Sequence, residues 1–165
     1  MRKNEIALLV FGVALFVIVY FYGRDALALT KKTIYDVSDY DELINNYAAH
    51  FGLDPLLIRA VIMQESSWRP DVMGYDGRSV GLMQITLPLA QDYFGHAVTF
   101  DDIAEPDINI HIGAWYLAKL MRRYNGDLNK ALDGYNEGPG NVDKGRDISY
   151  SDSVLAYYRA YGGTA

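Results

Sequence analysis

The chain has 165 residues, of which 50% are hydrophobic and 22% charged, so its length suits one compact domain with a short additional segment. It contains no cysteine, which excludes disulfides, cysteine-based zinc sites and thiol nucleophiles. The formal net charge of -6, without clustered Lys and Arg, argues against a nucleic-acid partner.

The N-terminal part predicts a membrane segment. Residues 6–22 carry no charge, Arg2 and Lys3 precede them, and Arg24 follows them. As a helix, this run would span roughly 25 Å, close to the hydrocarbon thickness of a bilayer. Its apolar length exceeds the usual core of a signal sequence, which favours a retained anchor over cleavage after Ala28.

This prediction divides the chain into three parts. Residues 1–24 are the anchor or signal, residues 25–37 a tether of mixed polarity, and residues 38–165 the folded domain. With the anchor retained in an inner membrane, the domain lies outside the cytoplasm, in the periplasm. Cleavage would instead release it as a secreted protein.

The remaining chain predicts an all-α domain. Asp54 is a typical N-cap and Pro55 a typical first helical residue, and Asp76-Gly77 favours a small hairpin within a loop region rich in Gly, Pro and Asp. Apolar residues recur at helical spacing elsewhere. The predicted helices cover 38–51, 55–66, a segment capped by Thr86 that ends at Phe94, 107–124, 128–135 and 151–161.

Glu65 is the strongest candidate for chemistry. It lies four residues after Val61 and three after Ile62, so it falls on the apolar face of the helix 55–66. Apolar surroundings disfavour the ionised carboxylate and raise its pKa. A carboxylic acid that is still protonated near neutral pH can act as a general acid.

Five short motifs surround this residue in chain order. They are Glu65-Ser66, Gly-Leu-Met-Gln at 81–84, Pro106 with Asn109-Ile110 and Tyr116-Leu117, Tyr-Asn-Glu-Gly-Pro-Gly at 135–140, and Tyr150 with Val154. Together they resemble the catalytic domain of the lytic transglycosylases related to goose-type lysozyme, enzymes that cut the glycan strands of bacterial peptidoglycan. The resemblance implies a lysozyme-like helical domain, here preceded by one N-terminal transmembrane helix.

The resemblance also implies roles for particular residues. Glu65 protonates the glycosidic oxygen between N-acetylmuramic acid and N-acetylglucosamine, and its carboxylate then accepts a proton from the C6 hydroxyl that attacks C1, which yields a 1,6-anhydro sugar. Tyr150 is expected to hydrogen-bond Glu65. The substrate-binding set comprises Ser66, Gly81, Met83, Gln84, Tyr135 and Asn136. Within this set, Met83 is expected to pack in the floor of the site, and Ser66 to orient the end of the helix and the backbone of Glu65.

The departures from the family pattern include two that bear on substrate contacts. Glu137 stands where relatives have a small residue, so an extra carboxylate is expected at the edge of the cleft. Gly74-Tyr75 stands where many relatives place a serine that contacts the substrate.

Two other functions remain open. In a hydrolase like goose-type lysozyme, a loop carboxylate such as Asp71 or Asp76 would position water; a non-catalytic domain would bind the wall for an envelope-spanning machine. Expected partners are peptidoglycan strands, the inner membrane through the N-terminal helix, and a secretion, conjugation or phage-assembly apparatus. The histidines show no metal-ligand spacing, so no metal or other cofactor is expected.

Overall fold

The computed structural model describes residues 37–145 and 149–164. The predicted membrane segment, the tether and the cleavage position after Ala28 therefore lie outside the described residues, apart from the last residue of the tether. Among the helices that are described, none has the length and apolar character needed to cross a membrane.

The described part is mostly helical, as predicted, with one small antiparallel sheet. The elements are η1 (Val37–Tyr40), α2 (Asp41–Phe51), α3 (Pro55–Ser66), β1 (Ser79–Val80), β2 (Ile85–Thr86), α4 (Leu87–Phe94), α5 (Phe100–Ala104), α6 (Pro106–Arg123), α7 (Leu128–Glu137), α8 (Pro139–Val142) and α9 (Tyr150–Ala160).

The helix α3, which carries Glu65, begins and ends as its sequence requires. The Asp54 carboxylate accepts a hydrogen bond from the Leu56 amide at 2.8 Å, and Pro55 occupies the first turn, where its missing N–H is not needed. The helix ends at Ser66, and the next residue, Ser67, caps it with a left-handed backbone, φ 50°. One face, including Ile58 and Ile62, is fully buried against α2 and α9.

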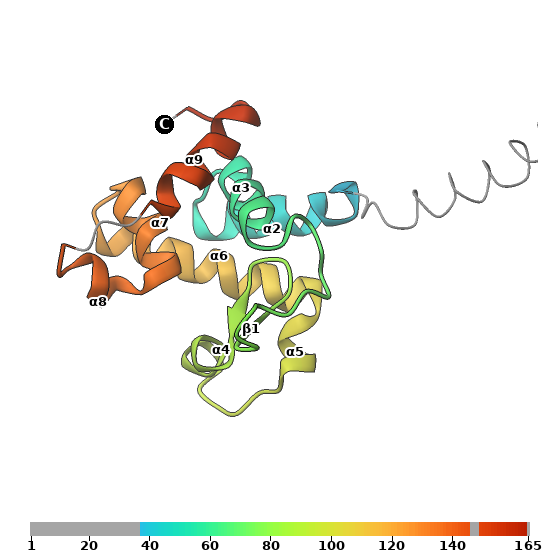
Figure 1. The fold of residues 1–165 in the computed structure, drawn as a ribbon. Helices are drawn as coiled ribbons and strands as arrows, with labels where there is room; N and C mark the ends of the chain where they lie inside the picture. The colour runs from blue at the N-terminus through green and yellow to red at the C-terminus, as the bar shows by residue number, and fades with distance from the viewer. Residues whose placement is uncertain (1–36, 146–148, 165) are drawn as a thin grey trace, which may run out of the picture. The chain divides into compact units, whose positions relative to one another are not determined.

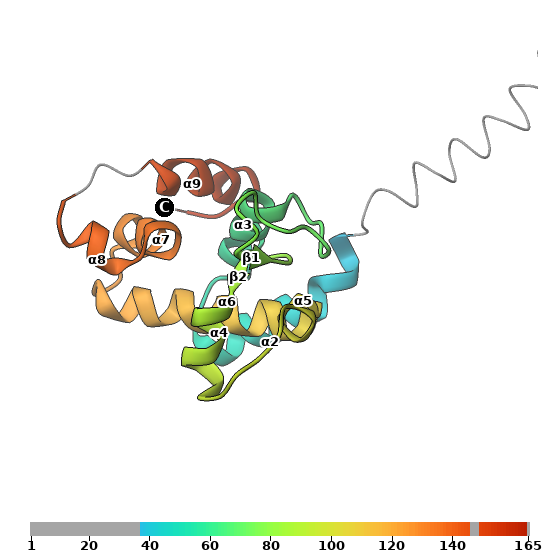
Figure 2. The same ribbon diagram turned by 60° about the horizontal axis from the view of Figure 1, so that its bottom comes forward.

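The helix α6 runs through the middle of the domain (Figures 1 and 2). It packs against α2, α5, α7 and β2. The elements α4, α5 and the small sheet lie on one side of it in Figure 1, whereas α3, α7 and α9 lie on the other. Chain segments from both halves of the domain therefore meet along α6.

The fully buried side chain of Asn109 fixes the small sheet to α6. Its amide nitrogen donates to the carbonyls of Val80 at 2.9 Å and Ile103 at 2.7 Å, and its oxygen accepts from the Met83 amide at 2.7 Å. Gly81 has φ 85°, and a Cβ there would collide with the Asn109 amide. Only glycine therefore allows this close approach.

The structure differs from the sequence-based expectations in several elements. The short helices α5 and α8 were not predicted, because five and four residues are too short for a helical period to be recognised. The helix α7 extends to Glu137, so Asn136 lies in its last turn and not in the following loop. The turn at Asp76-Gly77 does close a hairpin, in which Met73 forms an antiparallel bridge with Val80. The two named strands, β1 and β2, are instead joined by the turn at Gly81–Gln84.

Candidate active site

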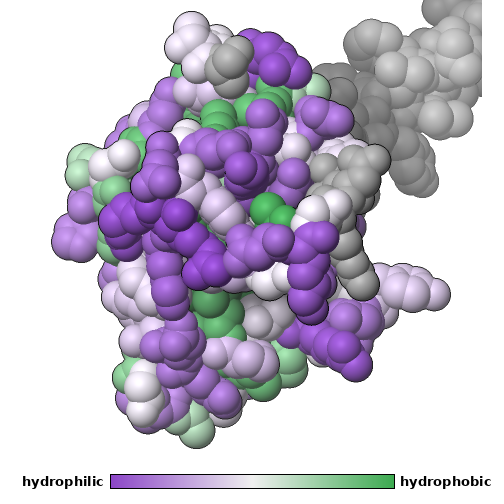
Figure 3. Space-filling model, turned by 90° about the vertical axis from the view of Figure 1, so that its left-hand side faces the viewer, coloured by the Kyte–Doolittle hydropathy of each residue, from purple (hydrophilic) through white to green (hydrophobic). Residues whose placement is uncertain are grey.

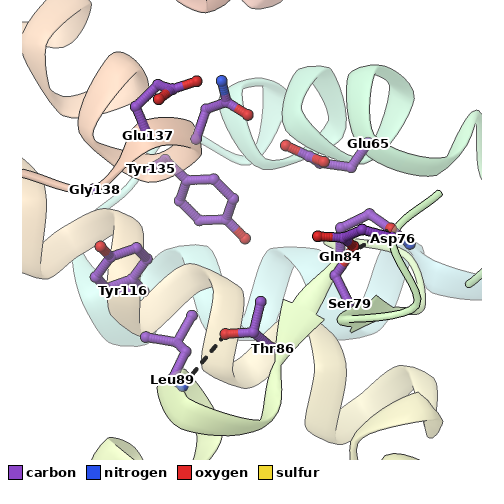
Figure 4. A pocket seen from close by; sticks show the side chains of 11 residues that line it. Glu65, Asp76, Ser79, Gln84, Thr86, Leu89, Tyr116, Tyr135, Glu137 and Gly138 are labelled. Atoms are coloured by element: carbon purple, nitrogen blue, oxygen red, sulfur yellow. Dashed lines mark hydrogen bonds between the residues drawn. The ribbon is translucent and has the colours of Figure 1, made fainter. Parts of the chain in front are cut away.

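A cavity of about 470 Å³ opens where α3, α4, α6, α7 and the loop before β1 meet. This size is within the usual range of ligand-binding pockets. Its lining residues are mostly polar: Glu65, Asp76, Ser79, Gln84, Thr86, Leu89, Tyr116, Tyr135, Asn136, Glu137 and Gly138. Figure 4 shows the Glu65 carboxyl group directed into the cavity from α3. The surface over α7 and α8 is also largely hydrophilic (Figure 3).

Glu65 and Tyr150 form the centre of this site. The Tyr150 hydroxyl donates a hydrogen bond of 2.5 Å to Oε1 of Glu65. Burial raises the pKa of Glu65 to about 7, although the Tyr150 hydrogen bond alone would lower it. Near neutral pH the carboxyl group is therefore present in both protonation states, which suits a group that first donates a proton and then accepts one.

Tyr135 forms the opposite wall of the cavity (Figure 4). Burial raises its pKa well above the usual value, so the hydroxyl stays protonated and donates to the Met83 carbonyl at 2.9 Å. The Tyr116 ring lies 5.5 Å from the Tyr135 ring, measured between centroids. The Met83 side chain is fully buried, and a Cβ at Gly113 would collide with it. The floor of the cavity is therefore tightly packed.

Gln84 and Ser79 form a third wall. The Gln84 amide nitrogen donates to the carbonyls of Val72 at 3.1 Å and Gly81 at 2.9 Å. Its oxygen accepts from the Ser79 hydroxyl at 2.8 Å. Gln84 also has a left-handed backbone, with φ 51°. The side chain thus holds the loop before β1 closed on itself.

The eight residues predicted for the site fall into three groups. Glu65, Gln84, Tyr135 and Asn136 line the cavity, and Tyr150 contacts it through Glu65. The other three, Ser66, Gly81 and Met83, are buried and do not line it.

Ser66 directly follows Glu65 at the end of α3. Its hydroxyl donates to the Ile62 carbonyl one turn earlier in α3 at 3.1 Å, within the buried part of the helix. It therefore helps to end the helix behind Glu65 instead of lining the cavity.

Two of the three carboxylates discussed as additions to the site also line the cavity. Asp76 and Glu137 are lining residues, whereas Asp71 is not. The carboxylate that replaces the small residue of the family pattern at position 137 thus lies at the cavity. The sequence-based interpretation missed Ser79, Thr86, Leu89, Tyr116 and Gly138 as lining residues. Tyr116 and Gly138 stood within recognised motifs, whereas Ser79, Thr86 and Leu89 carry no signal apart from their proximity to the turn at 81–84.

A metal centre is not found in the part of the chain that the structure describes, since no three His, Cys, Asp or Glu side chains are grouped there in a way that could hold an ion. His111 is instead stacked on Tyr47, with ring centroids 4.5 Å apart, and contacts the Tyr93 hydroxyl at 2.9 Å. Burial lowers the pKa of His111. This arrangement is that of a packed aromatic cluster.

Comparison with known proteins shows the family of this domain. The model of the transglycosylase SLT domain matches residues 42–156. The soluble lytic murein transglycosylase of Salmonella typhimurium is 32% identical over 112 residues, which cover 62% of this chain and 17% of that protein. The peptidoglycan transglycosylase gp16 of Escherichia phage T7 is 34% identical over 122 residues, which cover 72% of this chain and 9% of that protein.

A solved structure of a lytic transglycosylase also resembles this domain in fold. The 70 kDa soluble lytic transglycosylase SLT70 of Escherichia coli superposes with a TM-score of 0.66 at 25% identity, over 74% of this chain and 24% of that one. This chain therefore spans only a minor part of the length of these relatives. The matched region contains Glu65, the lining residues of the cavity and Tyr150, and the chain belongs to the transglycosylase SLT domain family.

Proposed function

We propose that this domain is a peptidoglycan lytic transglycosylase, which cleaves the bond between N-acetylmuramic acid and N-acetylglucosamine and leaves a 1,6-anhydro end. The observation that carries the proposal is the Glu65–Tyr150 pair, in which a carboxyl group with a pKa of about 7 faces a polar cavity. The names of the relatives support the same activity.

In the first half of the proposed reaction, protonated Glu65 gives its proton to the glycosidic oxygen as the bond to C1 breaks. In the second half, the Glu65 carboxylate takes the proton from the C6 hydroxyl of the same muramic acid, and that oxygen forms the new bond to C1. Glu65 ends protonated, ready for another cycle, and no water is consumed. The attack is intramolecular, so correct orientation in the cavity supplies much of the acceleration.

Tyr150 is proposed as the positioning residue for Glu65. Its hydroxyl donates to Oε1, which leaves Oε2 as the oxygen for proton transfer to the substrate. Burial and the neighbouring Glu65 carboxyl raise the pKa of Tyr150, so the hydroxyl remains a donor throughout the accessible pH range. Tyr135 and Asn136 line the cavity beside Glu65 and are proposed to contact the sugar.

The hydrolase remains the second candidate because Asp76 also lines the cavity, where it could orient water. Digestion of purified sacculi in oxygen-18 water separates the two reactions. Unlabelled fragments that are lighter by one water support the transglycosylase, whereas reducing ends that carry the label would establish hydrolysis. Mass spectrometry of the released muropeptides reads both outcomes.

We also propose that residues 1–24 anchor the domain to the inner membrane, with the active site in the periplasm. The uncharged run at 6–22 supports the anchor, and a wall-cutting activity requires a location outside the cytoplasm. The T7 relative supports a role in an envelope-crossing apparatus such as that of a phage. The anchored form predicts that Met1 is retained and that carbonate does not extract the protein from membranes; a mature N-terminus at Leu29 would contradict it.

A further inference from the structure

The hydrogen-bond donors of the wall formed by Ser79 and Gln84 are all used within the protein. Both N–H groups of the Gln84 amide are already used by the Val72 and Gly81 carbonyls. If the amide were flipped, its oxygen would face these two carbonyl oxygens, so its orientation is determined by its surroundings. Gln84 therefore has no donor left for a ligand.

The fixed orientation of Gln84 also determines what Ser79 can do. The Ser79 hydroxyl has one proton, and the Gln84 oxygen accepts it at 2.8 Å. The lone pairs of Ser79 Oγ remain, and Ser79 lines the cavity. Figure 4 shows Asp76, Ser79 and Gln84 together on the side of the cavity away from Tyr116 and Tyr135. This wall thus presents hydrogen-bond acceptors to the cavity.

Gly74 makes this arrangement possible. A Cβ at Gly74 would occupy the space of the Ser79 hydroxyl and would lie 3.0 Å from the Gln84 amide oxygen. Two backbone hydrogen bonds, from Gly74 to Ser79 at 2.8 Å and from Gly77 to Gly74 at 2.9 Å, hold the turn in this position. The Ser79 hydroxyl therefore fills the space that a side chain at 74 would take.

We propose that Ser79 is a substrate-binding residue whose hydroxyl accepts a hydrogen bond from an N–H or O–H group of an N-acetylated sugar, and that Gln84 is the positioning residue that fixes this hydroxyl. The inference deepens the proposed function, since it assumes that the cavity binds a glycan. It predicts that substitutions of Ser79 and Gln84 have different effects. Loss of the Ser79 hydroxyl removes an acceptor from the cavity, whereas loss of the Gln84 donors opens the loop from Val72 to Gly81.

The test measures binding and loop order separately. All variants of the full-length chain carry Glu65→Gln, so that the probe, the linear tetramer of N-acetylglucosamine, stays intact during titration calorimetry. Loop order is read from the rate at which trypsin cuts after Arg78, an exposed residue within the loop. Ser153→Ala, an exposed serine on α9, is the matched control.

We expect Ser79→Ala to weaken binding of the tetramer roughly two- to tenfold, the weight of one neutral hydrogen bond, with cleavage after Arg78 at the control rate. Gln84→Glu keeps an acceptor for Ser79 but loses the donors, so at pH 7.5 cleavage should accelerate roughly tenfold. Control-like binding by Ser79→Ala would overturn the proposal. So would equal acceleration of cleavage by Ser79→Ala, or none by Gln84→Glu. Cleavage of the tetramer by the Glu65→Gln parent would instead contradict the proposed role of Glu65.

Discussion

Glu65→Gln should abolish glycan cleavage and at the same time make the domain more stable above neutral pH. In the folded chain, burial raises the pKa of Glu65 from 4.5 to about 7. Between these two values the unfolded chain has already lost the proton that the folded chain retains, so stability falls as pH rises through this window. At about 1.4 kcal/mol per pKa unit, the full effect is on the order of 3 kcal/mol at pH 8.

Glutamine does not titrate and keeps an oxygen that can accept the Tyr150 hydrogen bond. The difference in free energy of unfolding between Glu65→Gln and the wild type should therefore grow by about 3 kcal/mol in favour of the variant between pH 4 and pH 8. Urea unfolding followed by tryptophan fluorescence measures it, because Trp68 is buried in the core near this helix. Other titrating groups cancel in the comparison. Glu42→Gln, on the exposed surface of α2, controls for the loss of one charge.

The cleavage assay uses the same two proteins. Loss of a positioned general acid should lower the rate by about a hundredfold to ten-thousandfold. A difference in stability that does not change between pH 4 and pH 8 would refute the assigned burial of the carboxyl group. Cleavage within about threefold of the wild type would refute its role as general acid.

Four further outcomes are expected. Tyr150→Phe removes the hydrogen bond that lowers the Glu65 pKa, so the alkaline limb of the pH–rate profile should move to higher pH; an unchanged limb would contradict the pairing. Asn109→Ala leaves buried backbone groups unpaired and should cost roughly 3 kcal/mol or more in urea unfolding, whereas exposed Asn45→Ala should cost little. Asp76→Asn should retain most cleavage activity, because the proposed reaction needs no carboxylate to position water. A loss of about a hundredfold would instead indicate a water-positioning carboxylate and hence a hydrolase. Removal of residues 1–28 should leave a soluble domain with an unchanged Tm in thermal unfolding, since the apolar residues of the described core, from Tyr40 to Tyr158, pack against one another.

The sequence predicted the helices with long apolar faces and clear caps. The helix that carries Glu65 is the best example, because an Asp cap, a first-turn Pro and an apolar stripe all indicate the same segment. The raised pKa of Glu65 followed from the same stripe, and the structure agrees with it. Local patterns can place a residue on a helix face, and for Glu65 that placement was sufficient to predict the direction of its pKa shift.

The remaining walls of the cavity depend on contacts between residues distant in the chain. Nothing near Asn109 in the sequence indicates that its amide binds the backbone of Val80 and Met83. Gln84 was expected to face the substrate because of its motif, yet the loop itself uses both of its donors. Such partners are set by tertiary packing, which a one-dimensional pattern does not contain.

The backbone near the active site is held in conformations that side chains seldom adopt. Ser67, Trp68 and Gln84 all have positive φ, between 50° and 66°, and each lies close to Glu65 in the chain or in the wall of the cavity. Such residues cost on the order of 1 kcal/mol or more each unless surrounding contacts offset the strain. Trp68 is buried and stacked on Tyr40, with ring centroids 6.3 Å apart. Gln84 is held by hydrogen bonds to both the oxygen and the nitrogen of its side-chain amide.

These contacts are all made by residues of the domain itself, and they offset the strain. The turn after Glu65 and the loop beside Ser79 are therefore held in place by the surrounding packing and hydrogen bonds. An enzyme whose nucleophile is part of the substrate gains most from this rigidity, because it accelerates the reaction mainly by holding the C6 hydroxyl and C1 in a reactive orientation. Relaxing the turn, for example by Trp68→Ala, should therefore lower kcat more than it raises KM for peptidoglycan; a change confined to KM would show that the turn serves binding alone.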